Sequence, residues 1–275
     1  MNRSIQTLKF EEIELNDDLI ELMAPFLADN HVFKCLEVVV NDLNKEDYIT
    51  TFLASFLLMF DYLTEFRLSY EGYNDDLDGV DEGRGMRTIV DYFDIVIQAL
   101  TVHTELMQLT FNNIDIRRRG CDSLVKLLNN CTNLKELHFS NMGMINDGWQ
   151  DIFTALQNTK CKLEKIELRG VEGANEVTAL CLSHALLHHS TTLKSLHLNQ
   201  QVRVVIPSVI IPLLQDPKSI LEELSLVNDN AANDAYSVTN EGIEVLTNAL
   251  AVNRRLKSLV LTGHRSITAE GWMIF

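Results

Sequence analysis

The sequence lacks an apolar run long enough to cross a membrane, and it lacks a secretory leader. Its longest apolar stretch, ITTFLASFLLMF at residues 49–60, is about half of the ~20 residues that a bilayer-spanning helix needs. The first residues, MNRSIQTLKFEEIEL, contain no apolar h-region. We therefore expect a cytoplasmic protein that is neither secreted nor inserted into a membrane.

Cysteine is scarce and odd in number. The five cysteines are scattered along the chain, at Cys35, Cys121, Cys131, Cys161 and Cys181. A disulfide framework uses even numbers of cysteines at compact spacings, whereas an intracellular compartment keeps scattered thiols reduced. The cysteine pattern therefore also favours an intracellular location.

Recognisable catalytic motifs are missing as well. The sequence has no glycine-rich phosphate loop, no Ser-His-Asp set and no paired carboxylates in a setting that would support chemistry. We therefore expect no enzymatic activity, no catalytic residue and no cofactor.

Two patterns resemble metal sites without completing one. Cys181, His184 and His188 have spacings that put them on one helical face, but a structural zinc site needs four ligands. Within the stretch 74–85, alternating oxygen side chains match the first half of a calcium loop, but Gly85 stands where a bidentate Glu is required. We interpret the first pattern as surface residues and the second as a solvated loop, and expect no metal site.

Negative charge is concentrated in the first third of the chain. Residues 1–82 hold 19 acidic and 5 basic side chains, against 20 and 18 in residues 83–275, and the formal net charge is −16. An acidic surface repels nucleic acid and attracts basic proteins. The excess equally fits a simple role in solubility, so we expect no nucleic-acid binding and a protein partner for which a basic surface is one possibility.

The strongest positive signal is a spacing of apolar residues at positions 0, +3 and +5. It recurs nine times: Ile5-Leu8-Phe10, Phe33-Leu36-Val38, Leu63-Phe66-Leu68, Leu106-Leu109-Phe111, Leu134-Leu137-Phe139, Leu163-Ile166-Leu168, Leu193-Leu196-Leu198, Leu221-Leu224-Leu226 and Leu256-Leu259-Leu261. Successive copies start 28 to 43 residues apart, and such a period is typical of a solenoid. We therefore expect one repeat domain over residues 1–275.

Each interval between the triplets carries helical periodicity. In GIEVLTNALAVN, Ile243, Leu246 and Leu250 fall on one face. Thr239 and Thr268 stand where short side chains cap helix starts. A single strand-helix unit cannot bury its apolar face, so the strands must stack into a parallel sheet covered by helices.

The segments NLKELHFSN, TLKSLHLNQ, ILEELSLVN and RLKSLVLTG resemble leucine-rich repeats of the ribonuclease-inhibitor-like subfamily. The resemblance implies an αβ horseshoe with the parallel sheet on its concave face. It also implies a non-enzymatic scaffold that binds a protein partner through the concave face and the rim loops. The chain departs from the family at position +8, where the family has Asn: Asn41 keeps it, but Ile114, Met142 and Val171 replace it.

Side chains alternate along a strand, so positions +2, +4 and +6 should face into the horseshoe. Parallel strands bring equivalent positions side by side, which predicts Glu37 beside Arg67 and His138 beside Glu167. The predicted partner-binding residues are Glu37, Glu65, Arg67, Glu136, His138, Glu167, Arg169 and His197. The competing interpretation is a set of solvated residues on an exposed sheet.

Other features leave alternatives open. The acidic insertion at residues 70–85 could serve as an arm for a basic partner. Arg117, Arg118 and Arg119 lie in a rim loop, which suggests a GTPase-activating regulator as the alternative function. The last repeat stops early, so we expect the native chain to continue beyond Phe275, the alternatives being a partner that covers the end or a structural subunit of a large assembly.

Overall fold

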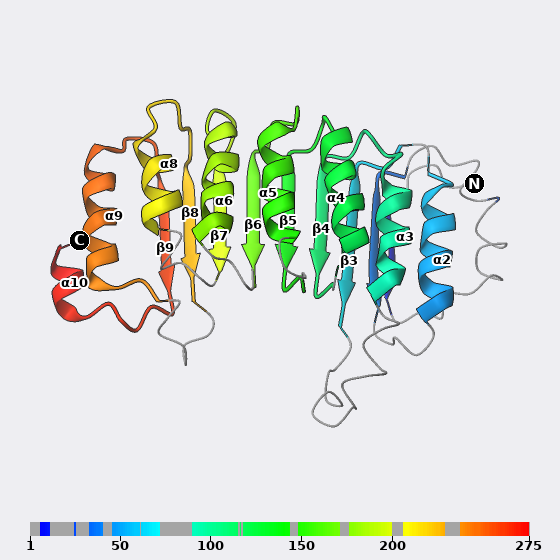
Figure 1. Cartoon of the computed structure of the whole chain (residues 1–275), viewed down its shortest axis with the longest axis horizontal. Coiled ribbons are helices and arrows are strands. Elements are labelled where there is room, and N and C mark those ends of the chain that lie inside the picture. The colour runs from blue at the N-terminus through cyan, green and yellow to red at the C-terminus, as the bar shows by residue number, and fades with distance from the viewer. Residues whose placement is uncertain are drawn as a thin grey trace, which may run out of the picture. The chain divides into compact units, whose positions relative to one another are not determined.

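The computed structural model describes residues 6–11, 25, 33–40, 46–60, 62–71, 90–114, 116, 118–143, 148–170, 176–199, 206–228 and 237–274. The chain forms two compact units. The first consists mainly of residues 1–134 and the second mainly of residues 135–141, 149–158 and 162–275. Each unit is a parallel sheet with helices on one face (Figure 1).

The elements of the first unit are β1 (Thr7–Glu11), β2 (Cys35–Val40), α2 (Glu46–Leu57), β3 (Glu65–Tyr70), α3 (Val90–Leu100), β4 (Gln108–Asn112) and α4 (Arg118–Asn130). β1, β2, β3 and β4 pair in that order, all parallel. α2, α3 and α4 cover one face of these strands (Figure 1).

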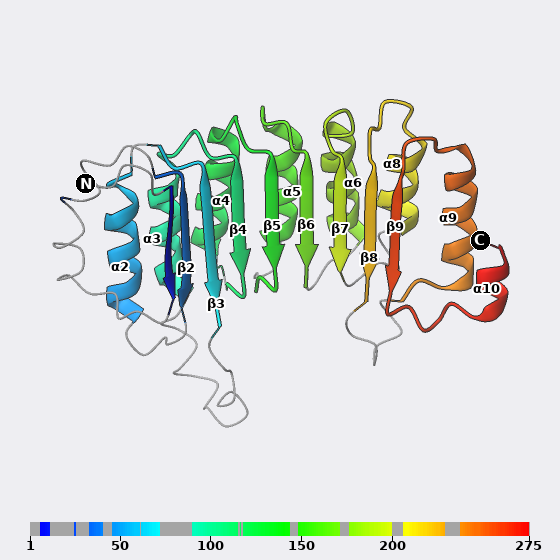
Figure 2. The ribbon, with the colours of Figure 1, turned by 180° about the vertical axis from the view of Figure 1, so that it is seen from behind.

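The elements of the second unit are β5 (Glu136–Ser140), α5 (Gly148–Asn158), β6 (Lys165–Arg169), α6 (Glu176–His188), β7 (Ser195–Asn199), η1 (Ile206–Ile210), α8 (Ile211–Gln215), β8 (Glu223–Val227), α9 (Asn240–Val252), β9 (Ser258–Thr262) and α10 (Ala269–Ile274). β5 to β9 pair in chain order, all parallel. Seen from behind, the strands of each unit lie in front of the helices (Figure 2).

The apolar triplets form the strands and most of the core, which confirms the predicted repeat pattern of strand and helix. The last triplet, at β9, is only half-buried. Leu36, Val38, Phe66 and Leu68 are completely buried on the helix side of β2 and β3. The spacing of three then two arises because the first residue precedes the strand and the next two alternate within it. Of the first triplet, Ile5 lies outside the described residues.

The two units fill their cores with different side chains. In the first unit Phe10 packs edge-on against Phe56, with ring centroids 5.3 Å apart, and Phe56 stacks on Phe52 at 5.4 Å. Leucine dominates the buried strand positions of β7 and β8. Aromatic rings bury more area per residue than leucine, so larger side chains fill this part of the core of the first unit.

The turn after the strand explains the departure at position +8. Asn113, Asn141, Gly170 and Gly263 stand at position +7, and all have positive φ, between 48° and 78°. Asn and Gly tolerate this left-handed conformation best. The next position is then apolar and buried: Ile114 and Met142 are at most 1% exposed.

The interval between β7 and β8 does not form a regular helix. A single π-turn, η1, runs into α8, which has Pro212 in its first turn. Pro207 and Pro212 both lack a backbone N–H, so a regular series of helical hydrogen bonds cannot pass through this segment.

Close packing of helices on their neighbours depends on glycine at two places. A Cβ on Gly120 would collide with Asp94 Oδ1 of α3, and a Cβ on Gly271 would collide with Asn240 Oδ1 of α9. The predicted cap at Thr239 is confirmed, since its hydroxyl accepts from the Gly242 N–H.

Among the residues that the structure describes, no helix combines the length and the apolar character needed to span a bilayer. The curvature of a horseshoe and the single domain over residues 1–275 stay predictions.

Candidate functional site

The side chains at positions +2, +4 and +6 lie on the sheet face away from the helices; we call this the polar face of each unit. Burial alternates along β3, β4, β5 and β6, with the apolar residues buried and the residues between them accessible. All eight predicted partner-binding residues are on the polar face. Arg169 is exposed and the other seven are half-buried.

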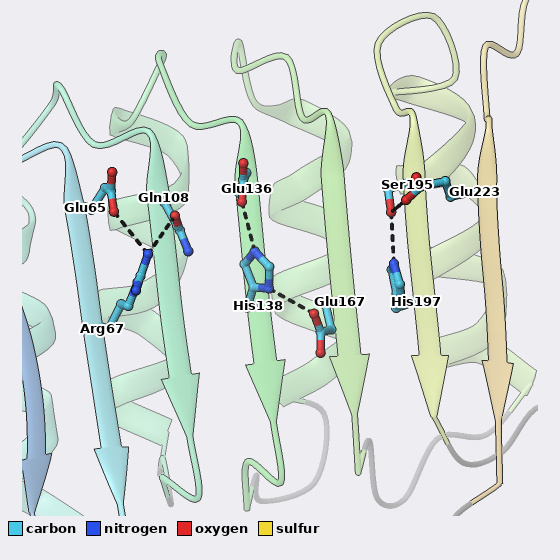
Figure 3. A network of polar contacts seen from close by, with 9 residues as sticks. All are labelled: Glu65, Arg67, Gln108, Glu136, His138, Glu167, Ser195, His197 and Glu223. Atoms are coloured by element: carbon cyan, nitrogen blue, oxygen red, sulfur yellow. Dashed lines mark hydrogen bonds and ion pairs between the residues drawn. The ribbon is translucent and has the colours of Figure 1, made fainter. Parts of the chain in front are cut away.

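Arg67 is the centre of the polar face of the first unit (Figure 3). Its Nη1 lies 3.4 Å from Glu37 Oε2 and its Nη2 lies 3.2 Å from Glu65 Oε2. Nη2 also donates to Gln108 Oε1 at 3.4 Å. The register pairs Glu37 with Arg67 as predicted.

Lys9 extends this cluster to the first strand. Its Nζ lies 2.8 Å from Glu11 Oε2 and 3.1 Å from Glu37 Oε1. Hydrogen bonds that Lys9 donates to these two carboxylates raise the pKa of Lys9. Glu37 therefore accepts from a cation on each neighbouring strand, and the three strands share one charge network.

His138 has the corresponding place in the second unit (Figure 3). Its Nδ1 lies 3.1 Å from Glu167 Oε2 and its Nε2 lies 3.3 Å from Glu136 Oε2. An imidazolium would donate to both carboxylates, whereas a neutral ring donates to one. The register pairs His138 with Glu167 as predicted.

Glu167 is held in its charged form. The hydrogen bond from His138, opposed by burial and assisted by Arg169, lowers the pKa of Glu167 to about 2. Arg169 Nε lies 2.7 Å from Glu167 Oε1. Glu167 is therefore ionised near pH 7 and accepts hydrogen bonds from His138 and Arg169.

Ser195, His197 and Glu223 form a third contact chain (Figure 3). Ser195 Oγ donates to Glu223 Oε2 at 3.0 Å, and His197 Nε2 lies 3.0 Å from Ser195 Oγ. The order is carboxylate, hydroxyl, imidazole, whereas nucleophilic catalysis needs imidazole between the other two. Because Glu223 already accepts the hydroxyl proton, this chain orients His197 and does not activate Ser195.

Sequence reasoning missed a ladder of alternating charges at position +1 in the second unit. Lys135 Nζ lies 3.3 Å from Glu164 Oε1, and Lys194 Nζ lies 2.7 Å from Glu164 Oε2. Lys257 pairs with Glu222 at 2.8 Å. The signal was present as Lys, Glu, Lys, Glu, Lys directly after the first leucine of the last five triplets.

Sequence reasoning also missed a buried layer at the helix ends. His103 Nε2 lies 3.0 Å from the Leu57 carbonyl oxygen, and His189 Nε2 lies 3.1 Å from that of Leu156. Asn253 Nδ2 donates to the Leu214 carbonyl at 2.8 Å. Each side chain adds a hydrogen bond to a carbonyl in the last turn of the preceding helix.

Burial lowers the pKa of His103, and it lowers the pKa of His189 to about 4 with a smaller contribution from the charge of His188. Both rings are therefore neutral near pH 7. The signal for this layer is a polar residue three or four positions before a triplet, which a pattern of apolar residues does not include.

His264 is a third buried histidine, at position +8 of the last repeat. Its Nδ1 accepts from the Val238 N–H at 3.2 Å, so its Nε2 must carry the proton that it donates to the Leu226 carbonyl at 3.0 Å. Burial lowers the pKa of His264. An imidazole thus takes the bridging role expected of Asn at this position.

The cysteines are poor candidates for chemistry. Cys35, Cys121, Cys131 and Cys161 are buried, and Cys181 is half-buried. Burial raises the pKa of Cys35 to about 11 and that of Cys131 to about 12. These two thiols are therefore protonated near pH 7 and are weak nucleophiles.

The remaining candidates do not come together in a site. His184 and His188 are exposed on the outer side of α6, as predicted. Within the described parts of the chain, no three His, Cys, Asp or Glu side chains gather closely enough to hold a metal ion. Arg118 and Arg119 were predicted in a rim loop but lie in the first turn of α4, where they are exposed. Arg118 Nε lies 3.8 Å from Asp122 Oδ1. Arg117 and residues 72–85 of the acidic insertion lie outside the described residues.

No protein-family model matches the chain, and no characterised protein sequence matches it significantly.

Proposed function

We propose that this chain is a non-enzymatic scaffold that binds a protein partner through the polar face and the adjoining rim loops. In this proposal it is a leucine-rich-repeat protein of the ribonuclease-inhibitor-like subfamily, an αβ horseshoe in which the polar face is concave. We expect the protein to work in the cytoplasm.

The observation that carries the proposal is the way charges are fixed on the polar face. Arg67 is held by two carboxylates, and Glu167 is held by His138 and Arg169. Side chains already fixed in place lose less conformational freedom when a partner binds. A face that holds charged groups at repeating positions therefore suits recognition of another protein.

The partner's chemistry follows from charge. The formal net charge of −16 favours encounter with a basic protein and makes the association rate fall with salt. The mixed signs on the polar face then select among basic partners, since a misplaced like charge at an interface is costly.

The proposal is tested by affinity capture with a variant that has alanine at Glu65, Arg67, Glu136 and Glu167. The control variant has alanine at Asp122, Glu241, Glu244 and Lys126, which are exposed on helices. Like the polar-face variant, it removes three negative charges and one positive charge, but from positions outside the polar face. Circular dichroism checks that both variants fold.

A partner retained by wild type and by the control but lost by the polar-face variant supports the proposal, and calorimetry with the purified partner then measures the loss. We expect the dissociation constant of the polar-face variant to be at least about tenfold larger than that of the wild type. Equal binding by both variants would place recognition elsewhere and overturn the proposal.

A further inference from the structure

A small pocket lies on the polar face of the second unit, at the carboxyl ends of β6, β7 and β8. Its volume is about 230 Å³, and it is lined by Arg169, His197, Leu198, Asn199, Ser225 and Val227. The strand register places these side chains in adjacent rows: His197 is opposite Ser225, and Asn199 lies between Arg169 and Val227. The pocket therefore consists of equivalent positions from three consecutive repeats.

The charge of the lining favours an anion. Of the six lining residues, only Arg169 has a permanent charge. Within the described part of the chain, its one ion pair joins Nε to Glu167 Oε1 at 2.7 Å. Glu167 thus holds the guanidinium by Nε, and the two terminal nitrogens remain to form a forked pair of hydrogen bonds with a carboxylate.

The histidine in the pocket has a defined orientation. Ser195 Oγ donates its proton to Glu223, so it accepts from His197 Nε2 (Figure 3). The neutral ring then has Nδ1 as its second hydrogen-bonding atom. Burial lowers the pKa of His197, so the ring is neutral near pH 7 and Nδ1 is an acceptor until it gains a proton.

We propose that this pocket binds one carboxylate group of a protein partner, from an Asp or Glu side chain. The terminal nitrogens of Arg169 and the hydroxyl of Ser225 donate to the carboxylate. His197 takes one proton from solvent on Nδ1 and donates it as a hydrogen bond, while Val227 contacts the methylene groups. The inference rests on the proposed function, because it assumes a protein ligand on the polar face.

A carboxylate can bind in this pocket although the chain as a whole is acidic. The long-range field of the chain repels an acidic surface. A single carboxylate within an otherwise basic partner surface escapes that repulsion and meets a cation at short range. The pocket would therefore select for one acidic residue in a basic surrounding.

Proton uptake gives the proposal a specific readout. The charged groups around His197 are Lys165, Glu167 and Arg169 on β6 and Glu223 on β8. A bound carboxylate adds a negative charge next to Nδ1, so binding should raise the pKa of His197. Affinity should correspondingly increase from pH 8 to pH 6.

The test uses the full chain and two peptides, Ac-Gly-Gly-Glu-Gly-Gly-NH2 and the same peptide with Gln in place of Glu. Histidine ring resonances are followed by NMR during titration. We expect saturable shifts of the His197 ring with the Glu peptide alone, and at least about tenfold weaker binding in Arg169→Gln. Lys218→Gln, which removes an exposed positive charge elsewhere, should bind as wild type does.

Equal binding of the two peptides, a loss of the same size in Lys218→Gln, or a His197 ring that does not shift would overturn the carboxylate pocket. These outcomes are independent of partner capture. If the Glu peptide fails while the four-residue polar-face variant still loses its partner, the pocket is wrong and the scaffold function stands.

Discussion

Histidine lies in two contrasting surroundings in this chain. His103 and His189 lie under helix ends, at most 4% exposed, with Nε2 next to a backbone carbonyl. On the polar face, the His138 side chain is 15% exposed and lies between two carboxylates. The same side chain is thus a neutral structural element in one region and part of a charge network in the other.

The contrast teaches that burial and neighbours, rather than residue type, decide what a histidine contributes. In the buried layer the ring is hydrogen-bonded to a carbonyl in the last turn of a helix, and protonation of the buried ring would destabilise the fold. On the polar face the neighbouring carboxylates accept hydrogen bonds from the ring. Changes to the two regions should therefore differ in size and in pH dependence.

Truncation should separate the two regions most strongly. His189→Ala leaves a cavity and removes a buried hydrogen bond to the Leu156 carbonyl, so it should lower the free energy of unfolding by about 2 to 4 kcal/mol. His138→Ala removes a half-buried polar contact and should cost less than about 1 kcal/mol. Urea unfolding at pH 7.5 measures both. Equal losses of unfolding free energy in the two variants would show that the helix-end layer is no more important for stability than the polar face.

The second-largest effect is a dependence of stability on pH. The pKa of His189 is about 4 in the folded protein, against 6.5 for an ordinary histidine. As pH falls from 6.5 toward 4, the unfolded chain takes up a proton that the folded chain does not, so stability falls. Between pH 7.5 and pH 5.5 this histidine should account for a loss of about 1 to 1.5 kcal/mol.

Replacement by Gln tests this assignment. His189→Gln should remove that part of the pH dependence in urea unfolding, whereas His184→Gln, exposed on the same helix, should retain it. The lower limit of pH 5.5 stays above the sequence pI of about 4.8, where solubility is lowest. An unchanged slope in His189→Gln would contradict the assignment.

On the polar face, His138 should control the titration of Glu167. The pKa of Glu167 is about 2 and the hydrogen bond from His138 is the largest cause, so His138→Gln should raise that pKa toward 4.5. The depressed pKa stabilises the fold above pH 4.5, and this contribution is lost as pH falls toward 2. At pH 7 the variant should be less stable by no more than about 0.5 kcal/mol, which is less than His138→Ala loses.

NMR of side-chain carboxyl carbons measures this titration directly. In the wild type Glu167 should still be ionised at pH values where exposed glutamates have taken up a proton. His184→Gln provides the control, since it removes a histidine outside the polar face. A Glu167 resonance that titrates identically in wild type and His138→Gln would show that Arg169 alone holds the carboxylate.

The smallest effect belongs to the exposed ladder. Glu164→Lys would place three like charges in a row with Lys135 and Lys194, and should cost about 0.5 to 1 kcal/mol at low salt. Screening should remove most of this difference at high salt. Adding Lys135→Glu should restore part of the stability at low salt, because it again pairs opposite charges at these two positions. A cost that persists at high salt would mean that the damage is steric.

Strands, register and the polar face could be predicted from the sequence because each follows from the apolar triplets. A register shift of one residue would expose Leu36 or Phe66, so burial alone fixes Glu37 beside Arg67. The helix-end layer could not be predicted in this way. A buried histidine looks polar in sequence, and its partner is a backbone carbonyl that every residue possesses.

The η1 segment and the pocket could not be predicted from the sequence either, for other reasons. Pro207 and Pro212 indicate an interrupted helix but not the path that the chain then takes. The pocket depends on Arg169, His197 and Ser225 together. The first two stand in the predicted binding set, but a serine at a strand position has no signal of its own.

The helix-end layer also determines where the chain can change length. From the last residue of each helix between α2 and α9 to the start of the next triplet, the offset is only four to six positions. Three of these short connections carry an anchoring side chain, His103, His189 or Asn253. Variation in repeat length lies on the other side, between triplet and helix. For protein engineering this gives a directional rule: a recognition loop or reporter peptide can be grafted after a strand, whereas the same insertion before a strand would separate two neighbouring repeats.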